Sequence, residues 1–169
     1  MKPLEMLKTR RSIRNFKQKS VPKEILDEIL DCAMQAPSAV NAQPWHFIVV
    51  KDQGLLKRVS EVHPYAKMAK DSAAAIIVCA EPQKEKIAGF FPQDCSAATQ
   101  NILLAAHFNN LGAVWCGIYP NEELMKKFCK LFDIPESIIP FSIVPLGYTD
   151  EKTGKVDRFK KDKVHYNTW

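Results

Sequence analysis

The chain has 169 residues, of which 46% are hydrophobic and 25% are charged, and it carries a formal net charge of +5. This composition is typical of a soluble globular protein, and the mild basicity does not by itself indicate a nucleic-acid-binding protein. The length predicts one domain spanning residues 1–169, and no apolar run approaches the roughly 20 residues of a membrane-spanning helix.

The first half of the chain predicts three helices and two strands. Residues 3–9 predict a short helix and residues 10–20 a polar loop. A second helix is expected to start with Pro22 at its first position and to end near Pro37. A loop rich in turn residues follows over 37–44. The remaining elements are a buried strand at 47–50, a short helix at 55–62 and a second buried strand at 73–80.

The second half continues the alternation of helices and strands. Residues 94–111 predict a long helix that Gly112 stops. We expect a third strand over 113–118, a helix over 122–132 capped by Asn121, and a fourth strand that includes 143–147. The tail from 149 to 169 is polar and charged. The fold class predicted from this order is α+β.

Common catalytic and nucleotide-binding motifs do not occur in the sequence. The glycines permit neither GxGxxG nor GxxxxGK[ST], so arginines would have to hold any phosphate. His46, His63, His107 and His165 show no metal-ligand spacing, and His107 is expected to be a hydrogen-bonded, half-buried helix residue. We therefore expect no metal and no catalytic side chain; an enzyme with this sequence would depend on a cofactor.

The cysteines indicate a reducing compartment. The chain has five of them, and no two form a CxxC pair (Cys32, Cys79, Cys95, Cys116 and Cys129). This number and spacing argue against a disulfide framework and a cysteine zinc site. The first residues also lack the apolar core of a signal peptide. We expect reduced, mainly buried thiols in a cytoplasmic protein.

The segment Arg10-Arg11-Ser12-Ile13-Arg14 concentrates three guanidinium groups. Their planar forks suit phosphate and carboxylate oxygens, and they repel one another unless an anion lies among them. The alternative is a solvated basic loop. Lys155, Arg158 and Lys160 add cations to the tail, which would reach the same phosphate if the tail folds back and would otherwise be solvated.

Three further segments have features of a ligand site, each with a plainer alternative. Ser38, Asn41 and Gln43 offer donors and acceptors to the edge of a flat heteroaromatic ring, or serve local turns. Gly117 would let the backbone approach a planar ligand, or simply ends a strand. Phe90-Phe91 precedes the long helix and would wall a substrate pocket, or belong to the core or an interface.

Together these segments resemble a known family. Residues 10–16, residues 36–47, and Asp94 with Ala98, Gln100 and Asn101 are similar to the nitroreductase family of FMN-dependent oxidoreductases, and residues 113–118, 158–159 and 165–169 resemble its short members. The resemblance implies a central, mainly antiparallel sheet flanked by helices. It also implies a homodimer with one FMN at each end of the interface.

The resemblance further assigns roles to individual residues. In one subunit, arginines of the N-terminal motif and Arg158 would hold the phosphate, and Ser12 and Arg14 would contact ribityl or pyrimidine oxygens. The loop of the partner subunit would approach the ring. The full expected set is Arg10, Arg11, Ser12, Arg14, Pro37, Ser38, Ala39, Asn41, Lys67, Cys116, Gly117, Ile118 and Arg158, with Phe90 and Phe91 at the substrate pocket. Lys67 or Lys70 would replace a lysine of longer members.

The activity implied is hydride transfer from NADH or NADPH through FMN to a nitroaromatic, quinone or similar acceptor by a ping-pong mechanism. Flavin N5 would carry the hydride, so no catalytic side chain is expected. Dehalogenation or flavin cleavage on the same fold is an alternative. A non-enzymatic basic module that binds nucleic acid or another anion is a second alternative, disfavoured because Phe16 is the one aromatic residue near the arginines. We expect neither nucleic acid nor membrane as partner.

Overall fold

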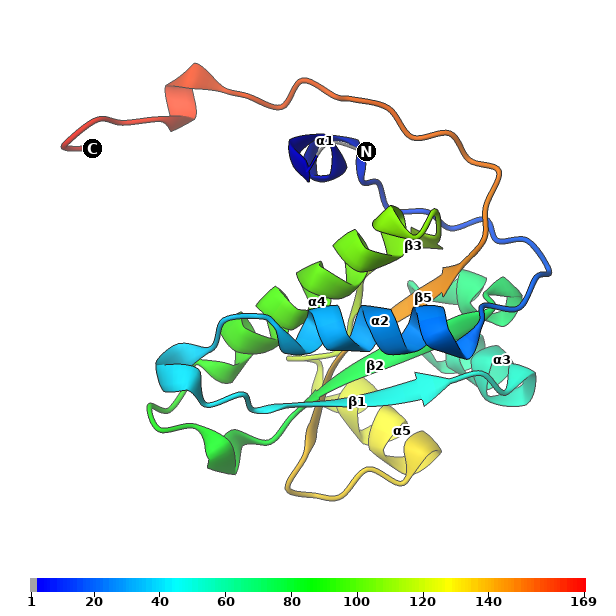
Figure 1. The fold of residues 1–169 in the computed structure, drawn as a ribbon. Helices are drawn as coiled ribbons and strands as arrows, with labels where there is room; N and C mark the ends of the chain where they lie inside the picture. Colours follow the sequence, from blue (N-terminus) through cyan, green and yellow to red (C-terminus); the bar gives the residue numbers. More distant parts are fainter. Residues whose placement is uncertain (1–2) are drawn as a thin grey trace.

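A computed structural model describes residues 3–169, and its centre is a five-stranded antiparallel sheet (Figure 1). The inner strands are β2 (Ala74–Ala80) and β5 (Ile139–Gly147), and β1 (Trp45–Val50) pairs with the outer side of β2. Two short strands, β3 (Gly112–Ala113) and β4 (Cys116–Gly117), both pair with β5. The predicted α+β class with a mainly antiparallel sheet is confirmed.

Helices cover both faces of this sheet. The helices α2 (Lys23–Met34) and α4 (Phe91–Phe108) lie on one face, and α3 (Gln53–Val62) and α5 (Glu122–Phe132) on the other (Figure 1). Side chains alternate along β2, so Ile76 packs under the first pair and Ile77 under the second. Every residue of β2 is therefore buried, as the apolar run in the sequence predicts.

Most of the predicted helices are confirmed, with shifted ends. The helix α5 has the predicted bounds, and Asn121 Oδ1 accepts the Leu124 N–H at 2.9 Å as its cap. The helix α4 begins at Phe91 rather than Asp94, because Pro92 fits the first turn, and it ends at Phe108 rather than Leu111, with Asn109 as its C-cap. Pro22 lies one position before α2 rather than inside it. Short 3-10 turns occupy Ala39–Asn41, Lys67–Asp71, Pro82–Lys84 and Lys161–Lys163.

Two strand predictions needed correction. The strand β1 is an edge strand with His46 and Val49 exposed, so it is not fully buried. The expected strand over 113–118 is interrupted between β3 and β4. Val114 N–H donates to Pro145 O at 3.2 Å, but proline has no N–H to return to Val114, and the ladder breaks there.

The two ends of the chain lie outside these layers. The short helix α1 (Pro3–Thr9) and the extended tail pass over the end of α4, and Lys155 Nζ lies 2.9 Å from Glu5 Oε1 (Figure 1). All residues from 154 to 169 are exposed. No helix among residues 3–169 has the length and apolarity to cross a membrane. Three of the five cysteines, Cys79, Cys95 and Cys116, are buried, as expected.

Candidate functional site

The arginine segment is held against the sheet by its backbone. Ser12 forms a parallel bridge with Ala113, and Ile13 N–H donates to Ala113 O at 3.0 Å. Side chains in an extended segment alternate, so Ile13 is buried while Ser12 and Arg14 are exposed. The close contact needs a glycine at 112, where a Cβ would lie 2.5 Å from Ile13 Cγ2.

Three guanidinium groups from distant parts of the sequence gather here. Burial lowers the pKa of Arg10, and the nearby charges of Arg11 and Arg158 lower it further. Arg10, Arg11 and Arg158 line a cavity of about 470 Å³ between α1 and residues 155–159. Among the ion pairs of residues 3–169, none includes an arginine. An anion in this cavity would relieve the repulsion.

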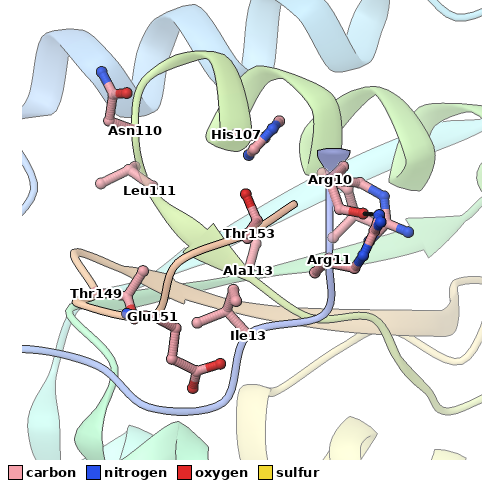
Figure 2. A pocket seen from close by; sticks show the side chains of 11 residues that line it. Arg10, Arg11, Ile13, His107, Asn110, Leu111, Ala113, Thr149, Glu151 and Thr153 are labelled. Carbon is pink, nitrogen blue, oxygen red and sulfur yellow. Dashed lines mark hydrogen bonds between the residues drawn. The ribbon is translucent and has the colours of Figure 1, made fainter. Parts of the chain in front are cut away.

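A second, smaller pocket lies beside the same arginines. Its volume is about 260 Å³, and Figure 2 shows His107 and Thr153 above Ala113 and Ile13, with Arg10 and Arg11 to one side. His107 Nε2 donates to Thr9 Oγ1 at 2.9 Å, since the Thr9 hydroxyl donates to Glu5 O. Burial, then Arg10 and Arg11, lower the pKa of His107. His107 is the half-buried, hydrogen-bonded residue that the sequence predicts.

Arg14 lies close enough to Cys116 in β4 for its charge to act on the Cys116 thiol. Burial raises the pKa of the Cys116 thiol to about 11, and the charge of nearby Arg14 opposes that rise. Gly117 is exposed, and a Cβ there would meet nothing closer than Tyr119 O at 4.0 Å. Ile118 is 1% exposed, and its N–H and carbonyl are bonded to Phe141 O at 2.9 Å and to the Asn121 N–H at 3.0 Å. It therefore presents little to a ligand in this chain. The open backbone at Gly117 suits a flat ring.

Lys67 is placed on the 3-10 turn that follows α3. Its ammonium donates to Ser60 O at 3.0 Å, the carbonyl of a residue in α3. The neighbouring Tyr65 carbonyl accepts from Cys116 Sγ at 3.4 Å. Lys67 therefore lies beside a segment that contacts β4, but its ammonium is hydrogen-bonded to α3.

The loop after α2 forms a tight turn at the other end of the molecule. Val40, Asn41 and Gln43 have φ of 52°, 54° and 48°. Ser38 Oγ accepts the Gln43 N–H at 2.9 Å, so Ser38 does serve a local turn. Asp94 Oδ1 accepts the Ala39 N–H at 2.9 Å and ties the loop to α4. Asp94 was missing from the predicted site, because an acidic residue in a first helical turn is ordinary.

The two phenylalanines before α4 have different environments. Phe91 is 8% exposed, and its ring centroid lies 5.2 Å from that of Tyr119 within the core. Phe90 is 37% exposed at the residue preceding α4. Of the two, only Phe90 presents its ring to solvent.

The predicted site residues form two groups that lie far apart in one chain. Residues 37–41 lie at the start of α4 through Asp94, whereas Arg10 lies beside His107 near its end (Figure 1). At 1.5 Å per residue, these two helix positions are about 20 Å apart. The structure brings Arg10, Arg11 and Arg158 together and places Arg14 beside Cys116. It does not bring residues 37–41 to them.

Comparison with known proteins is consistent with this geometry. A protein of Methanothermobacter thermautotrophicus, provisionally named an NADH dehydrogenase/NAD(P)H nitroreductase, is 54% identical over 100% of this chain and 88% of its own length. The structure of an FMN-dependent nitroreductase from Clostridium difficile R20291 has a TM-score of 0.90 at 30% identity, covering 98% of this chain and 99% of that one.

A second similar structure was solved with a ligand. It is a provisionally assigned nitroreductase of Desulfovibrio desulfuricans in complex with FMN, with a TM-score of 0.84 at 25% identity over 100% of this chain and 99% of that one. The model of the nitroreductase family itself matches residues 7–79 and 57–148. The chain therefore belongs to the nitroreductase family.

Proposed function

We propose that this chain is an FMN-dependent oxidoreductase that takes hydride from NADH or NADPH and reduces nitroaromatic compounds, quinones or similar acceptors. Family membership supports the proposal, as do a relative named for NAD(P)H and a structural neighbour named for FMN. The observation that carries it is the cluster of Arg10, Arg11 and Arg158 around one cavity. Asp157 also lines this cavity, but no carboxylate among the described residues forms an ion pair with these arginines.

The residues present fit a flavin mononucleotide. Guanidinium groups bind phosphate through paired, charge-assisted hydrogen bonds, and the cluster contains three such groups. The Arg11 guanidinium already donates to the carbonyls of Lys8, Arg10 and Gly154, so Arg10 and Arg158 are the better phosphate ligands. Ser12 and Arg14 are exposed on the same edge as the arginines, and Gly117 leaves space for a flat ring. Lys67 fits less well, because reaching a ribityl oxygen would require its ammonium to leave Ser60.

The protein's part in the reaction is binding, orientation and electrostatics. When bound, FMN supplies reversible hydride transfer between nicotinamide and acceptor. Arg10, Arg11 and Arg158 would anchor the phosphate, and Ser12 would orient the chain that joins it to the ring. Arg14 would place a positive charge where negative charge develops on the ring edge. Reductant and acceptor would occupy the same open face in turn.

A second copy of the chain would complete the site. Residues 37–41 lie about 20 Å along α4 from the arginines that would hold the phosphate, so one chain does not gather both groups around one point. In a homodimer with two-fold symmetry, the loop of each copy would face the arginines of the other. An interface crevice also gives a large cofactor walls from two chains while one face stays open.

The visible spectrum of the purified protein tests the proposal. We expect a yellow protein with the absorption of oxidised flavin, which releases FMN on denaturation and is bleached by NADH or NADPH. Steady-state rates with nitroaromatics, quinones and halogenated phenols should give parallel double-reciprocal lines. The halogenated compounds test the dehalogenating alternative. A colourless protein that stays colourless with excess FMN, yet is retained on nucleic acid in a salt-dependent way, would instead indicate a basic binding module.

A further inference from the structure

The backbone at Val40 is strained, and packing of the Val40 side chain does not offset that strain. Val40 adopts φ 52° and ψ 28°, a left-handed conformation that is strongly disfavoured for a β-branched residue. The side chain is 54% exposed, so it gains little from packing. Asn41 and Gln43 are also left-handed. Such a conformation persists only where surrounding contacts hold it.

One hydrogen bond from another element holds this turn. Within the loop, Asn41 N–H donates to Ser38 O and Ala42 N–H to Ala39 O, both at 3.0 Å. Gln43 N–H donates to Ser38 Oγ. Among the described residues, the only hydrogen bond to residues 39–43 from outside the loop is the one that Asp94 Oδ1 accepts from Ala39 N–H at 2.9 Å.

Asp94 has no comparable role in its own helix. The start of α4 is capped by Glu85, whose carboxylate accepts the N–H groups of Gly89 and Phe91. Asp94 is 4% exposed, and its Oδ2 is buried with no partner among residues 3–169. Burying a carboxylate with one oxygen unpaired is unfavourable. The hydrogen bond from Ala39 N–H is thus the one stabilising contact found for the buried Asp94 carboxylate among the described residues.

We propose that Asp94 is a positioning residue that holds the left-handed turn at Val40 and so fixes where Ser38 and Asn41 are presented. This inference rests on the proposed function for its consequence, because Ser38 and Asn41 would then meet the flavin ring bound by the second subunit. Without the anchor, the turn would relax toward right-handed or extended backbone, and both side chains would move.

A double-mutant cycle tests the link between Asp94 and Val40. The Asp94→Ala variant should bind FMN at least about tenfold more weakly, because a hydrogen bond to a charged acceptor is lost. Asp94→Asn keeps an acceptor oxygen and should stay within about threefold of the wild type. Val40→Asn places a residue that tolerates the left-handed region, so it should restore most of the affinity lost in Asp94→Ala. Val49→Asn, at a partly exposed valine of β1, is the control and should restore none.

Thermal unfolding of the flavin-free protein gives a second readout. Val40→Asn alone should raise the midpoint by relieving strain. The rise in midpoint that Val40→Asn causes should be larger in the Asp94→Ala variant than in the wild type, because the two residues are coupled. Unchanged FMN affinity in Asp94→Ala, or no recovery with Val40→Asn, overturns the inference. A wild type that binds no FMN overturns the proposed function instead, whereas coupling in the flavin-free protein would still support the role of Asp94 at the turn.

Discussion

Arg10 is held in an environment that disfavours its positive charge when no anion is bound. Its pKa is lowered by burial and by two other guanidinium groups, so the protonated form is under strain from its neighbours. A phosphate dianion would reverse the sign of that interaction. The affinity for the cofactor should therefore depend strongly on each member of the cluster.

We predict that Arg10→Ala and Arg158→Ala each weaken FMN binding by about 10- to 150-fold, the equivalent of one charge-assisted hydrogen bond. Flavin per protein after purification and fluorescence titration of the flavin-free protein measure the loss. Arg58→Ala, at an exposed arginine of α3, is the matched control and should keep full occupancy. Two fully yellow variants would remove the phosphate assignment.

His63 is the other residue whose environment makes a clear prediction. It is fully buried, its Nε2 donates to Gly117 O at 3.0 Å, and its Nδ1 accepts the Tyr65 N–H at 3.1 Å. Both ring nitrogens are therefore satisfied only in the neutral form. Burial lowers the pKa of His63 below its ordinary value, the hydrogen bond to Gly117 O opposes part of this shift, and nearby Lys67 adds to it.

The sign of the pH effect follows from this lowered pKa. Below the unfolded value of about 6.5, the unfolded chain takes up a proton that folded His63 resists. Stability should then fall as the pH drops from 7 toward 5. Chemical denaturation across this range should show a smaller fall in His63→Gln. His107→Gln should reduce the fall as well, because its pKa is also lowered, while exposed His165→Gln should leave it unchanged. Equal slopes in wild type and His63→Gln would contradict the assignment.

At the scale of the element, the contact between β3 and the arginine segment decides whether the cluster is placed correctly. A Cβ at Gly112 would lie 2.5 Å from Ile13 Cγ2 and 3.1 Å from Thr149 Cγ2. Ile13 is buried and its neighbours on both sides carry candidate ligand groups. Moving Ile13 would thus move Ser12 and Arg14 with it.

We expect Gly112→Ala to lower stability by about 1–3 kcal/mol, as overpacking does, and to weaken FMN binding at the same time. Gly154→Ala is the matched control, since a Cβ there meets nothing within 4 Å. Urea denaturation and FMN titration of both variants measure the two effects. A Gly112→Ala protein as stable as Gly154→Ala would show that the segment is not held where the structure places it.

The elements themselves were largely predictable from the sequence, and the failures have local causes. Hydrophobic periodicity is a property of each segment, so β2 and α5 were predicted closely. The exposure of β1 depends on which strand lies at the sheet edge, and the gap in 113–118 depends on Pro145 facing it across the sheet. Both are tertiary facts. The anchor that Asp94 gives to Ala39 spans 55 positions and has no local signal.

In the whole molecule, the candidate site residues form two groups near opposite ends of α4. One chain places the arginines near one end of α4 and residues 37–41 at the other end. Under the proposed function, two chains would be needed to bring these groups together. The motifs indicate which residues belong together chemically, but not in which chain they meet. That distinction came from the family resemblance, and the length of α4 gives it a physical basis.

The tail provides the last test of this two-chain arrangement. Phe159, Tyr166 and Trp169 are 69%, 84% and 100% exposed, and the Trp169 ring stacks on that of nearby His165, with centroids 4.4 Å apart. Large exposed apolar surfaces are often where a partner binds. We therefore expect the tail to pack on the second copy and to contribute to the stability of the dimer.

Deleting residues 164–169 should raise the concentration at which the dimer dissociates by at least about tenfold, because two aromatic anchors that the dimer would bury are lost. Sedimentation velocity over a dilution series measures this concentration. The double variant Lys161→Ala and Lys163→Ala keeps the aromatic residues and should leave the dimer unchanged. Flavin occupancy should fall together with the dimer, because each ring would lose the loop of its second subunit. A truncated protein that remains dimeric at the dilution where the full chain begins to dissociate would place the interface elsewhere.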